Sequence, residues 1–397
     1  MATTINANNT DGVVITPDTS GELELQANGV TKAKVTANGL QDANGNSLRG
    51  GSFRNLIING DMRIAQRGTS ESGISNASSY LLDRFLFGNS NIGTWTQSQD
   101  SDVPSGQGFV KSIKLNCTAS DTPSGTELLS VQQRIEAQNL QHLKYGTSNA
   151  EDCTVSFWVK SNKTGTYTFA IYQFDGTAQG ISKTYTINSA DTWEYKTITI
   201  EGNTGNGIDN DNGAGLGLYW ILSAGSDRSS SPLQTSWGAF DTNAFVSSSQ
   251  VNLADSTSNY INITGLQLEI GEGSSNFEFL PYDVQLQRCQ RYYWKYVEGM
   301  SKYISMASLS NSSTVQTILT FPTTMRANPT LDHSTGTNYY GYYGTAGWDD
   351  FNSLTQEYTS NSSIGLYSLT GVSGTAGHGV AMATRNASAY VAFSAEL

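Results

Sequence analysis

The sequence predicts an all-β protein in which many short strands are separated by turns. Charged residues make up only 14% of the 397 residues, whereas Gly occurs 40 times and aromatic residues account for 10%. Ser, Thr and Asn are also abundant. β-Branched and aromatic residues favour strands, while Gly, Asn and Ser favour turns. A third observation is the period-two alternation of apolar residues at 154–160 and 166–174, which is typical of strands with one buried face.

Residues 1–52 are predicted to be a short N-terminal β segment for docking or oligomerisation. Asn-Gly pairs begin at residues 28, 38 and 44, and Asn-Gly is a strong hairpin signal because both residues tolerate positive φ. The stretches 22–26 and 31–36 between them alternate, but each offers only one or two apolar side chains. So few cannot build a core. We expect this segment to pair with copies of itself or with a partner; a floppy terminal tail is the alternative.

Residues 53–288 are predicted to form a jelly-roll β-sandwich, because strand-like stretches and turns alternate at regular spacing. Further strands are expected at 55–62, 110–115, 183–187, 194–201, 217–223 and 260–270. The alternation places one face of each strand in the core. Eight side chains are therefore expected to be buried: Phe157, Val159, Phe169, Ile171, Leu218, Trp220, Leu266 and Leu268.

Two helices are also expected. Residues 132–144 place Ile135, Leu140 and Leu143 near one face of a helix, and Asp283 could cap a helix over 284–290. Pro281 and Tyr282 mark the point where the chain leaves the sandwich.

Residues 289–397 are predicted to be a C-terminal β-sandwich-like domain that lies distal to the N-terminal segment. Strands are expected at 314–321, 364–369, 380–383 and 390–393, and the last of these carries no charge and suits a buried position. Residues 336–351 are expected to form a loop, because Gly341, Gly344 and Gly347 interrupt this segment every three residues.

Charge and cysteine usage exclude several classes of protein. The formal net charge of −12 argues against nucleic acid as a partner, because phosphates need clustered Lys and Arg. No apolar run approaches the ~20 residues that span a bilayer, so membrane insertion is not expected. The first ten residues lack the basic and apolar regions of a secretory signal. Three scattered Cys form no disulfide framework or CxxC metal site.

An enzymatic function is not expected. Asp83 and Glu269 are carboxylates that could act in acid–base chemistry on a sugar bond. We expect instead that Asp83 pairs with Arg84 to hold a loop, and that Glu269 lies on the solvated face of its strand. The sequence contains no Gly-x-Ser-x-Gly, His-Glu-x-x-His or Gly-Lys-Thr motif.

Two aromatic clusters are the candidate ligand-binding residues. Sugars are recognised by flat aromatic rings under their apolar faces, with amides and acids at their hydroxyls. Both kinds of group occur among Gly and Asn in 237–243 and 339–350, where loops carry recognition on a fixed scaffold. The alternative is packing against a neighbouring subunit, since Tyr and Trp are enriched at protein interfaces. The candidates are Trp237, Phe240, Tyr339, Tyr340, Tyr342, Tyr343, Trp348 and Asp349.

Several stretches resemble proteins of tailed bacteriophages. The opening MATTIN, with GELEL at 21–25 and GVTKA at 29–33, resembles the N-terminus of tail-fibre and appendage proteins, especially of marine phages. NLIINGDMRIAQR at 55–67, TVSFWVK at 154–160 and ITGLQLEI at 263–270 resemble a phage-borne jelly roll akin to carbohydrate-binding modules. PYDVQLQRCQRYY at 281–293 and the final AFSAEL resemble the end of the same proteins.

This resemblance implies a virion tail protein that recognises the host. It implies a homotrimer, attachment to another phage tail protein through residues 1–52, and noncovalent binding of host surface polysaccharide. A purely structural tail adaptor without a glycan site is the alternative. Because carbohydrate-binding jelly rolls often carry a structural calcium, the oxygen-rich loop at 207–213 is a candidate calcium site through Asp209 and Asp211. It departs from an EF-hand loop, and a solvated turn is the other interpretation. No other cofactor is expected.

Overall fold

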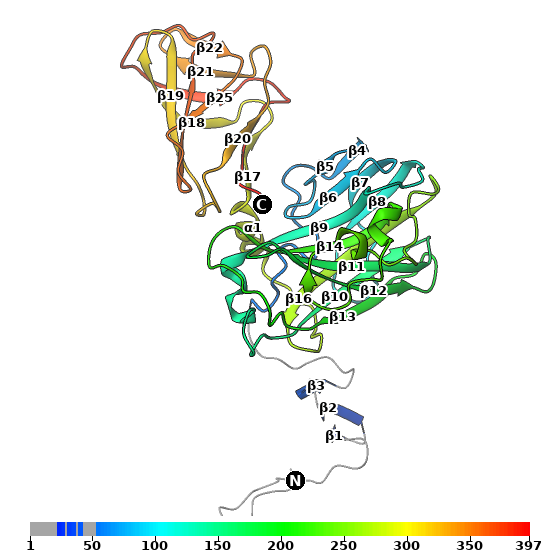
Figure 1. Cartoon of the computed structure of the whole chain (residues 1–397). Helices are drawn as coiled ribbons and strands as arrows, with labels where there is room; N and C mark the ends of the chain where they lie inside the picture. Colours follow the sequence, from blue (N-terminus) through cyan, green and yellow to red (C-terminus); the bar gives the residue numbers. More distant parts are fainter. Residues whose placement is uncertain (1–21, 28–29, 37–38, 43–52) are drawn as a thin grey trace, which may run out of the picture.

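The computed structural model describes residues 22–27, 30–36, 39–42 and 53–397 and is almost entirely β (Figure 1). The predicted all-β class is confirmed. The Asn-Gly pairs at residues 28 and 44, and Asn38 of the third pair, lie outside the described residues. All strand pairs between named strands are antiparallel in the part of the chain that is described.

The N-terminal segment contains a three-stranded sheet, with strands β1 (Leu23–Ala27), β2 (Val30–Thr36) and β3 (Gly39–Asp42) in that order. The predicted strands at 22–26 and 31–36 are confirmed. Leu25, Val30, Val35 and Leu40 are all exposed. This small sheet therefore encloses no apolar core among its described residues, as its composition predicts.

The central domain is a sandwich of two sheets. The six-stranded sheet contains, in spatial order, β13 (Glu194–Ile200), β10 (Cys153–Ser161), β16 (Tyr260–Ile270), β8 (Ser112–Ala119), β7 (Thr94–Asp100) and β4 (Ser70–Ile74). The seven-stranded sheet contains β15 (Gly238–Ala239), β12 (Gln179–Ile187), β11 (Gly165–Gln173), β14 (Ala214–Ala224), β9 (Leu128–Glu136), β6 (Leu86–Ser90) and β5 (Ser78–Ser79). Three short 3₁₀ helices lie between strands: η1 (Ala137–Leu143), η2 (Ser226–Ser229) and η3 (Thr242–Ala244).

The core of the sandwich lies between these two sheets. All eight side chains predicted for the core are fully buried there. Aromatic rings fill its centre, where Phe157 packs edge-on against Tyr185 and Trp220 at 5.1 and 5.9 Å between ring centroids.

Two local predictions in this domain are wrong. Residues 132–136 belong to strand β9, and only η1 is helical within the predicted helix 132–144. The Gln and Arg residues of this stretch favour helix intrinsically, but pairing of β9 with β14 and β6 overrides that preference. Residues 55–62 form no strand; they make a buried, turn-rich segment in which Asn59 and Met62 have positive φ.

The helix α1 (Tyr282–Gln290) connects the sandwich to the C-terminal domain. The predicted helix is confirmed, but its expected cap is wrong: Pro281 occupies the N-cap, and Asp283 lies in the first turn. Cys289 and Tyr292 pack with Ile58 and Ile64 in a small apolar cluster. The helix is therefore packed against the beginning of the sandwich domain.

The C-terminal domain contains two further sheets and its own core, built around Tyr340, Phe351, Met382 and Phe393. A three-stranded sheet contains β17 (Tyr293–Glu298), β26 (Tyr390–Ser394) and β20 (Thr330–His333). A seven-stranded sheet contains β22 (Gly347–Phe351), β21 (Tyr340–Gly344), β25 (Gly379–Thr384), β18 (Tyr303–Asn311), β19 (Thr314–Thr320), β24 (Ser363–Ser368) and β23 (Thr355–Glu357). The predicted buried final strand is confirmed as β26, the middle strand of its sheet.

The expected loop at 336–351 is wrong from residue 340 onward, because β21 and β22 form a regular hairpin there, whereas residues 336–339 lie in turns outside any strand. Their register runs from Tyr340 opposite Phe351 to Gly344 opposite Gly347. The two glycines flank the turn, and Gly347 has a φ of +101°. Gly344 and Gly347 therefore close this hairpin, and Gly341 lies within β21 opposite Asp350 without interrupting the strand.

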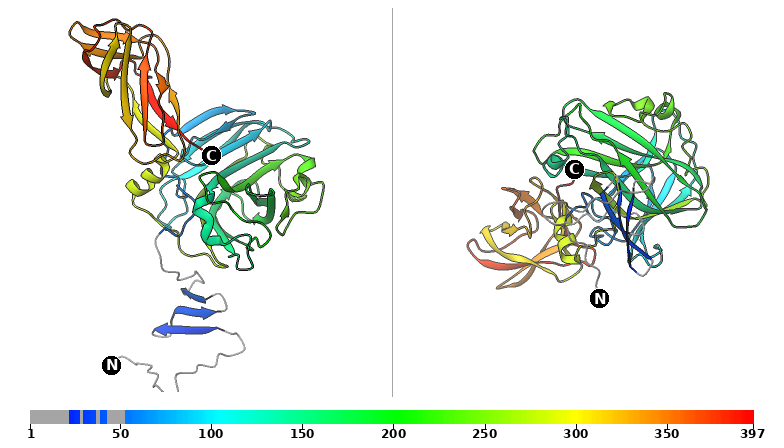
Figure 2. Two further views of the ribbon diagram at one scale, coloured as in Figure 1. Left: turned by 60° about the vertical axis from the view of Figure 1, so that its left-hand side comes forward. Right: turned by 90° about the horizontal axis from the view of Figure 1, so that it is seen from below.

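Figures 1 and 2 show the C-terminal domain at one end of the sandwich and the N-terminal sheet at the other. The last residues of the chain return to the sandwich. Glu396 forms an ion pair with the buried Arg84 and another, at 3.3 Å, with Arg67. Within the described residues, no helix has the length and apolarity needed to span a membrane.

Candidate functional site

An aromatic groove on the outer face of the six-stranded sheet begins with Trp158. Alternation in β10 sends Val155, Phe157 and Val159 into the core, so Trp158 points to the opposite face. Tyr195 lies directly across from it on β13. The two rings are 5.3 Å apart and tilted by 47°, and Tyr195 is 39% exposed. Together they make one wall of the groove.

Three phenylalanines make the other wall. The rings of Phe109, Phe277 and Phe279 lie 4.9–5.1 Å apart in a mutual cluster, and Phe279 is exposed. A glycine in the floor allows this arrangement. Gly265 has a φ of +64°, and a Cβ there would lie 2.6 Å from Phe109 Cζ. It sits at an irregularity in the pairing of β16 with β10, between the partners of Ser156 and Trp158.

The groove encloses about 570 Å³, and amides and a hydroxyl supply its polar lining, through Gln107, Asn276 and Ser156. No hydrogen bond joins the Trp158 indole N–H to another residue in the described part of the chain, so this donor remains available. A pocket with apolar walls and a few polar groups suits a ligand that has both kinds of surface. A pyranose ring has an apolar face for the aromatic walls and hydroxyls for the amides.

The structure divides the predicted tyrosine-rich cluster into buried and exposed members. Tyr340 and Tyr342 lie in the core of the C-terminal domain, while Tyr343 and Trp348 are 55% and 40% exposed on the other side of the hairpin. The exposed rings face each other at 5.4 Å. The Arg385 guanidinium lies 4.1 Å from the centre of the Trp348 ring and is held by Asp350 at 2.9 Å. Tyr343 and Trp348 thus remain candidates as a pair presented to solvent.

The other predicted residues of this cluster have mainly structural contacts. Tyr339 packs partly against the domain core. Asp349 accepts hydrogen bonds from the Tyr342 hydroxyl and the Ser373 backbone N–H, both at 2.7 Å. Its carboxylate therefore fixes the hairpin, although it also lines a pocket of about 240 Å³ beside Trp348.

Trp237 and Phe240 lie at the sandwich and not beside the C-terminal hairpin. The Trp237 indole N–H donates to the Glu201 carbonyl at 2.6 Å, and its ring packs on Tyr145 at 5.7 Å. Phe240 packs edge-on against Tyr172 and Phe245. Both rings are partly buried in these contacts, so the two predicted clusters do not form one site.

The candidate calcium loop precedes β14. Asp211 Oδ1 accepts a hydrogen bond from the Gly213 backbone N–H at 2.8 Å, and the Asp209 N–H donates to Asp175 Oδ2 at 3.1 Å. Burial, with the nearby charges of Asp209 and Asp211, raises the pKa of Asp175. No group of three His, Cys, Asp or Glu side chains arranged to hold a metal is found in the described ranges. Calcium at Asp209 and Asp211 stays a prediction.

The expected Asp83–Arg84 pair is wrong. Asp83 accepts hydrogen bonds from the backbone and side chain of Gln66, whereas Arg84 contacts Glu396. Arg84 has a positive φ of 71°, and both residues are buried. They hold the loop through separate partners.

Glu269 is also buried, which corrects the expectation that it faces solvent. It accepts hydrogen bonds from Gln267 and from the Ser275 N–H and hydroxyl at 2.7–2.9 Å, and Arg54 lies at 3.7 Å. The segment after β16 folds back over this strand and covers the polar face that alternation alone assigns to water.

Sequence reasoning missed the groove. The signal for it was Trp158 itself, a large aromatic at an outward position of a clearly alternating strand. Phe277 and Phe279 follow the last strand of the sandwich and are two residues apart, so in an extended chain they point to the same side. Nothing local, however, joins Phe109 to Phe277, which are brought together only by the folded sheet.

No protein-family model and no curated protein matches this sequence. Among solved structures, the chain is similar to the enzymatically active domain of tailspike protein 4 of bacteriophage CBA120, with 15% identity and a TM-score of 0.29 over 55% of this chain. The chain spans 21% of that structure's length. It is also similar to a putative sugar-binding protein of Bacteroides thetaiotaomicron, at 11% identity and a TM-score of 0.29 over 54% of this chain and 99% of the other. A family 11 carbohydrate-binding module of Clostridium thermocellum shows 10% identity and a TM-score of 0.24 over 52% and 99% of the two chains.

Proposed function

We propose that this protein binds a glycan noncovalently, and that the groove lined by Trp158, Tyr195 and Phe279 is its binding site. The observation that carries this proposal is the pairing of two aromatic walls with an amide-rich lining in one groove of about 570 Å³. Aromatic walls bury the apolar face of a sugar ring, and rigid rings give contact area at low entropic cost.

Binding of the full-length chain to a glycan array tests this proposal. Trp158→Ala should lower binding at least tenfold, since it removes one ring of the groove. Tyr303→Ala, at a tyrosine that is exposed on the C-terminal domain, is the control and should leave binding unchanged. Equal binding by the Trp158 variant and the parent protein would remove the groove as the site.

The chemistry proposed is binding without bond cleavage. Incubation of the protein with the polysaccharide that it binds, followed by size-exclusion chromatography of the polysaccharide, checks this point. The chain length of the polysaccharide should stay constant. A fall in chain length would make the protein an enzyme.

We infer further that the protein is a tail fibre in a phage virion, where it binds host surface polysaccharide during adsorption as a homotrimer. This proposal is supported by the resemblance of residues 1–6, 21–25, 29–33 and 55–67 to proteins of tailed bacteriophages. Sedimentation of the full chain should give a trimer. Deleting residues 1–52 should abolish incorporation into the particle while leaving the sandwich folded; a clean monomer of the full chain would contradict the proposal.

A structural adaptor without a glycan site is the second candidate, and one surface favours it. Met306, Ile318 and Tyr358 are 71%, 75% and 89% exposed on the seven-stranded sheet of the C-terminal domain, and they line a groove of about 650 Å³. Contiguous exposed apolar surface of this kind is typical of protein interfaces. Tight binding to another tail protein, lost in Ile318→Asp and combined with a blank glycan array, would favour this function.

A further inference from the structure

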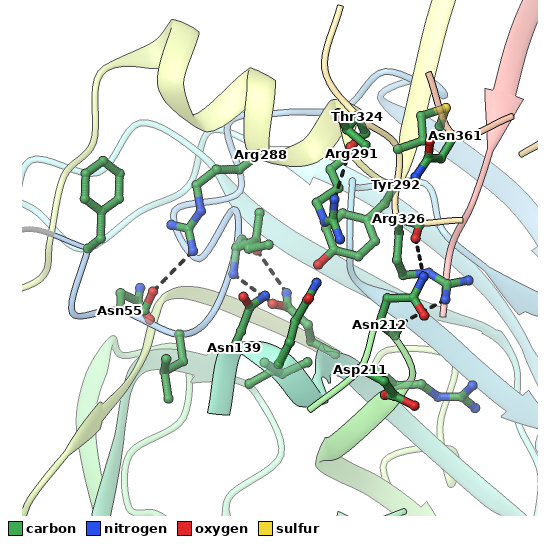
Figure 3. Close-up of a pocket in the computed structure, with 18 of the residues that line it drawn as sticks. Asn55, Asn139, Asp211, Asn212, Arg288, Arg291, Tyr292, Thr324, Arg326 and Asn361 are labelled. Atoms are coloured by element: carbon green, nitrogen blue, oxygen red, sulfur yellow. Dashed lines mark hydrogen bonds between the residues drawn. The ribbon is translucent and has the colours of Figure 1, made fainter. Parts of the chain in front are cut away.

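A polar cleft separates the sandwich from the C-terminal domain. It encloses about 760 Å³, and α1, η1, the loop before β14 and the turn at 324–326 contribute its walls. Figure 3 shows Arg288 and Arg291 reaching into it from above and Asn139 facing them from below. Several chain segments that are distant in sequence thus present side chains to one space.

The cleft concentrates positive charge in an acidic protein. Four arginines line it: Arg134, Arg288, Arg291 and Arg326. Among the described residues, Arg291 is the one of these four that forms a salt bridge, through two hydrogen bonds of 2.7 Å to Glu136. Arg326 donates to backbone carbonyls of Asn212, Ala395 and Glu396.

Most of the arginines that form no salt bridge line this cleft. Of the ten arginines in the described ranges, four form no salt bridge, and three of those four line the cleft. The fourth, Arg228, lies elsewhere and donates to the Thr126 carbonyl at 2.8 Å. Against these charges, the lining contains one carboxylate without an arginine partner, Asp211.

Arg288 leaves most of its hydrogen-bonding capacity unused among the described residues. Its guanidinium makes one hydrogen bond, to the Asn55 carbonyl, at a long 3.4 Å, although it has five N–H donors. Burial lowers the pKa of Arg288, and the nearby charge of Glu278 offsets part of this effect. A guanidinium fork matches the two oxygens of a carboxylate, and such bidentate pairs are among the stronger hydrogen bonds.

The rest of the lining suits a sugar. Asn139 and Asn361 are exposed, and their side-chain amides form no hydrogen bond with other described residues. Phe53 also lines the cleft and is 59% exposed, so its ring face is accessible. The cleft therefore combines a guanidinium with unused N–H donors, two amides without a hydrogen bond to other described residues, and an exposed ring.

From this combination we propose that the cleft binds an oligosaccharide of carboxylated sugar units, an oligohexuronate, with one carboxylate on the Arg288 guanidinium and hydroxyls of its units on Asn139 and Asn361. This site is separate from the aromatic groove and does not depend on it. It would give the protein a preference for acidic polysaccharides in addition to any neutral sugar held by the sheet.

Titration of the full-length protein with trigalacturonate, followed by calorimetry, tests the proposal. Arg288→Gln should weaken binding at least tenfold, and Asn139→Ala, on the exposed η1 surface, should weaken it about threefold. Arg228→Gln removes an arginine that also lacks an ion pair but lies outside the cleft, and should leave binding unchanged. Trp158→Ala should also leave it unchanged, which separates this site from the groove.

Two further probes identify the ligand chemistry. The methyl ester of trigalacturonate keeps the sugar rings but loses the charge, and should bind at least tenfold more weakly. Sodium acetate at the same carboxylate concentration should compete poorly. Full competition by acetate would assign the cleft to small carboxylates and overturn the sugar proposal. Equal binding of the ester, unchanged binding by both cleft variants, or no binding of trigalacturonate would overturn it as well.

Discussion

Phe157 is the residue on which the packing of the sandwich can be tested most directly. Its ring is fully buried and touches Tyr185 and Trp220 in the middle of the core. Truncation of a large core side chain leaves a cavity, so Phe157→Ala should lower the free energy of unfolding by about 3–5 kcal/mol. Urea denaturation measures this. Ile318→Ala, at an exposed site, should change it by less than about 0.5 kcal/mol, and equal effects of the two substitutions would contradict the assignment of faces.

Asp83 is a single residue whose protonation is coupled to folding. Burial raises the pKa of Asp83 from 3.8 to about 6, even though hydrogen bonds from Gln66 lower it. Because the folded pKa lies above the unfolded one, the contribution of Asp83 to stability is fully present below pH ~4 and is lost as the pH rises through ~6. A pKa shift of this size corresponds to about 3 kcal/mol in the free energy of unfolding.

Asp83→Asn removes this titration. The stability of the variant relative to the parent should therefore increase by about 3 kcal/mol between pH 4 and pH 7. Urea denaturation at several pH values across this range checks the expectation. Parallel stability profiles for the two proteins would show that Asp83 is not buried as described.

Individual residues were predictable where alternation alone decides burial. Val159, Phe169 and Leu268 follow period two and are buried as expected. The burial of Asp83 and Glu269 was not predictable. Each side chain is covered by another segment of the chain, and the sequence around the residue gives no sign of that segment. Burial of a polar side chain depends on the partners that satisfy it, and those partners are known only from the fold.

At the scale of elements, the hairpin of β21 and β22 presents Tyr343 and Trp348 to solvent while Tyr340 and Tyr342 anchor it in the core. If the exposed pair contacts the host, Trp348→Ala should reduce adsorption at least several-fold and leave the oligomeric state unchanged. Tyr303→Ala, at an exposed tyrosine of the same domain, serves as the control. Loss of the oligomer, with adsorption falling only in proportion, would instead place Trp348 at a subunit interface.

Most strands could be predicted, whereas the hairpin could not. The prediction for β16, Tyr260–Ile270, has the observed bounds. The hairpin was missed because the spacing of the glycines was given more weight than the alternation of the aromatic residues. Tyr340 and Tyr342 alternate along β21 and are buried, and Phe351 on β22 lies opposite Tyr340. Strand β9 was misjudged for a related reason: its pairing partners, β6 and β14, supply more stabilisation than the helix preference of its own residues.

At the scale of the whole molecule, Glu396 links the end of the C-terminal domain to the sandwich. Arg84 is fully buried, and Glu396 is the carboxylate that it contacts. Removing one partner of a buried pair leaves an uncompensated charge, so Glu396→Ala should destabilise the protein by about 3–5 kcal/mol. Thermal unfolding measures the effect.

A matched substitution distinguishes this buried pair from ordinary surface charge. Glu298 pairs with Lys295 at 3.0 Å but is 61% exposed, so Glu298→Ala should cost less than about 1 kcal/mol. The double variant Arg84→Met with Glu396→Leu should recover much of the loss, because apolar side chains can replace a buried pair. Equal effects of the two single substitutions would contradict the role of Glu396.

The return of the chain to the sandwich has a mechanical consequence. The C-terminal domain is entered through α1 and β17, and it is left through β26, whose following residue Ala395 donates a backbone hydrogen bond to Tyr292 at 2.7 Å. Both attachments lie at its base, whereas β21 and β22 lie at the far end (Figure 1). A tensile load applied at that tip is thus shared by one covalent connection, through α1, and by the noncovalent contacts of Glu396 with Arg67 and Arg84. Survival under force depends on how fast these contacts yield and not on equilibrium stability. The Arg84–Glu396 ion pair therefore resists separation of the C-terminal domain from the sandwich under load.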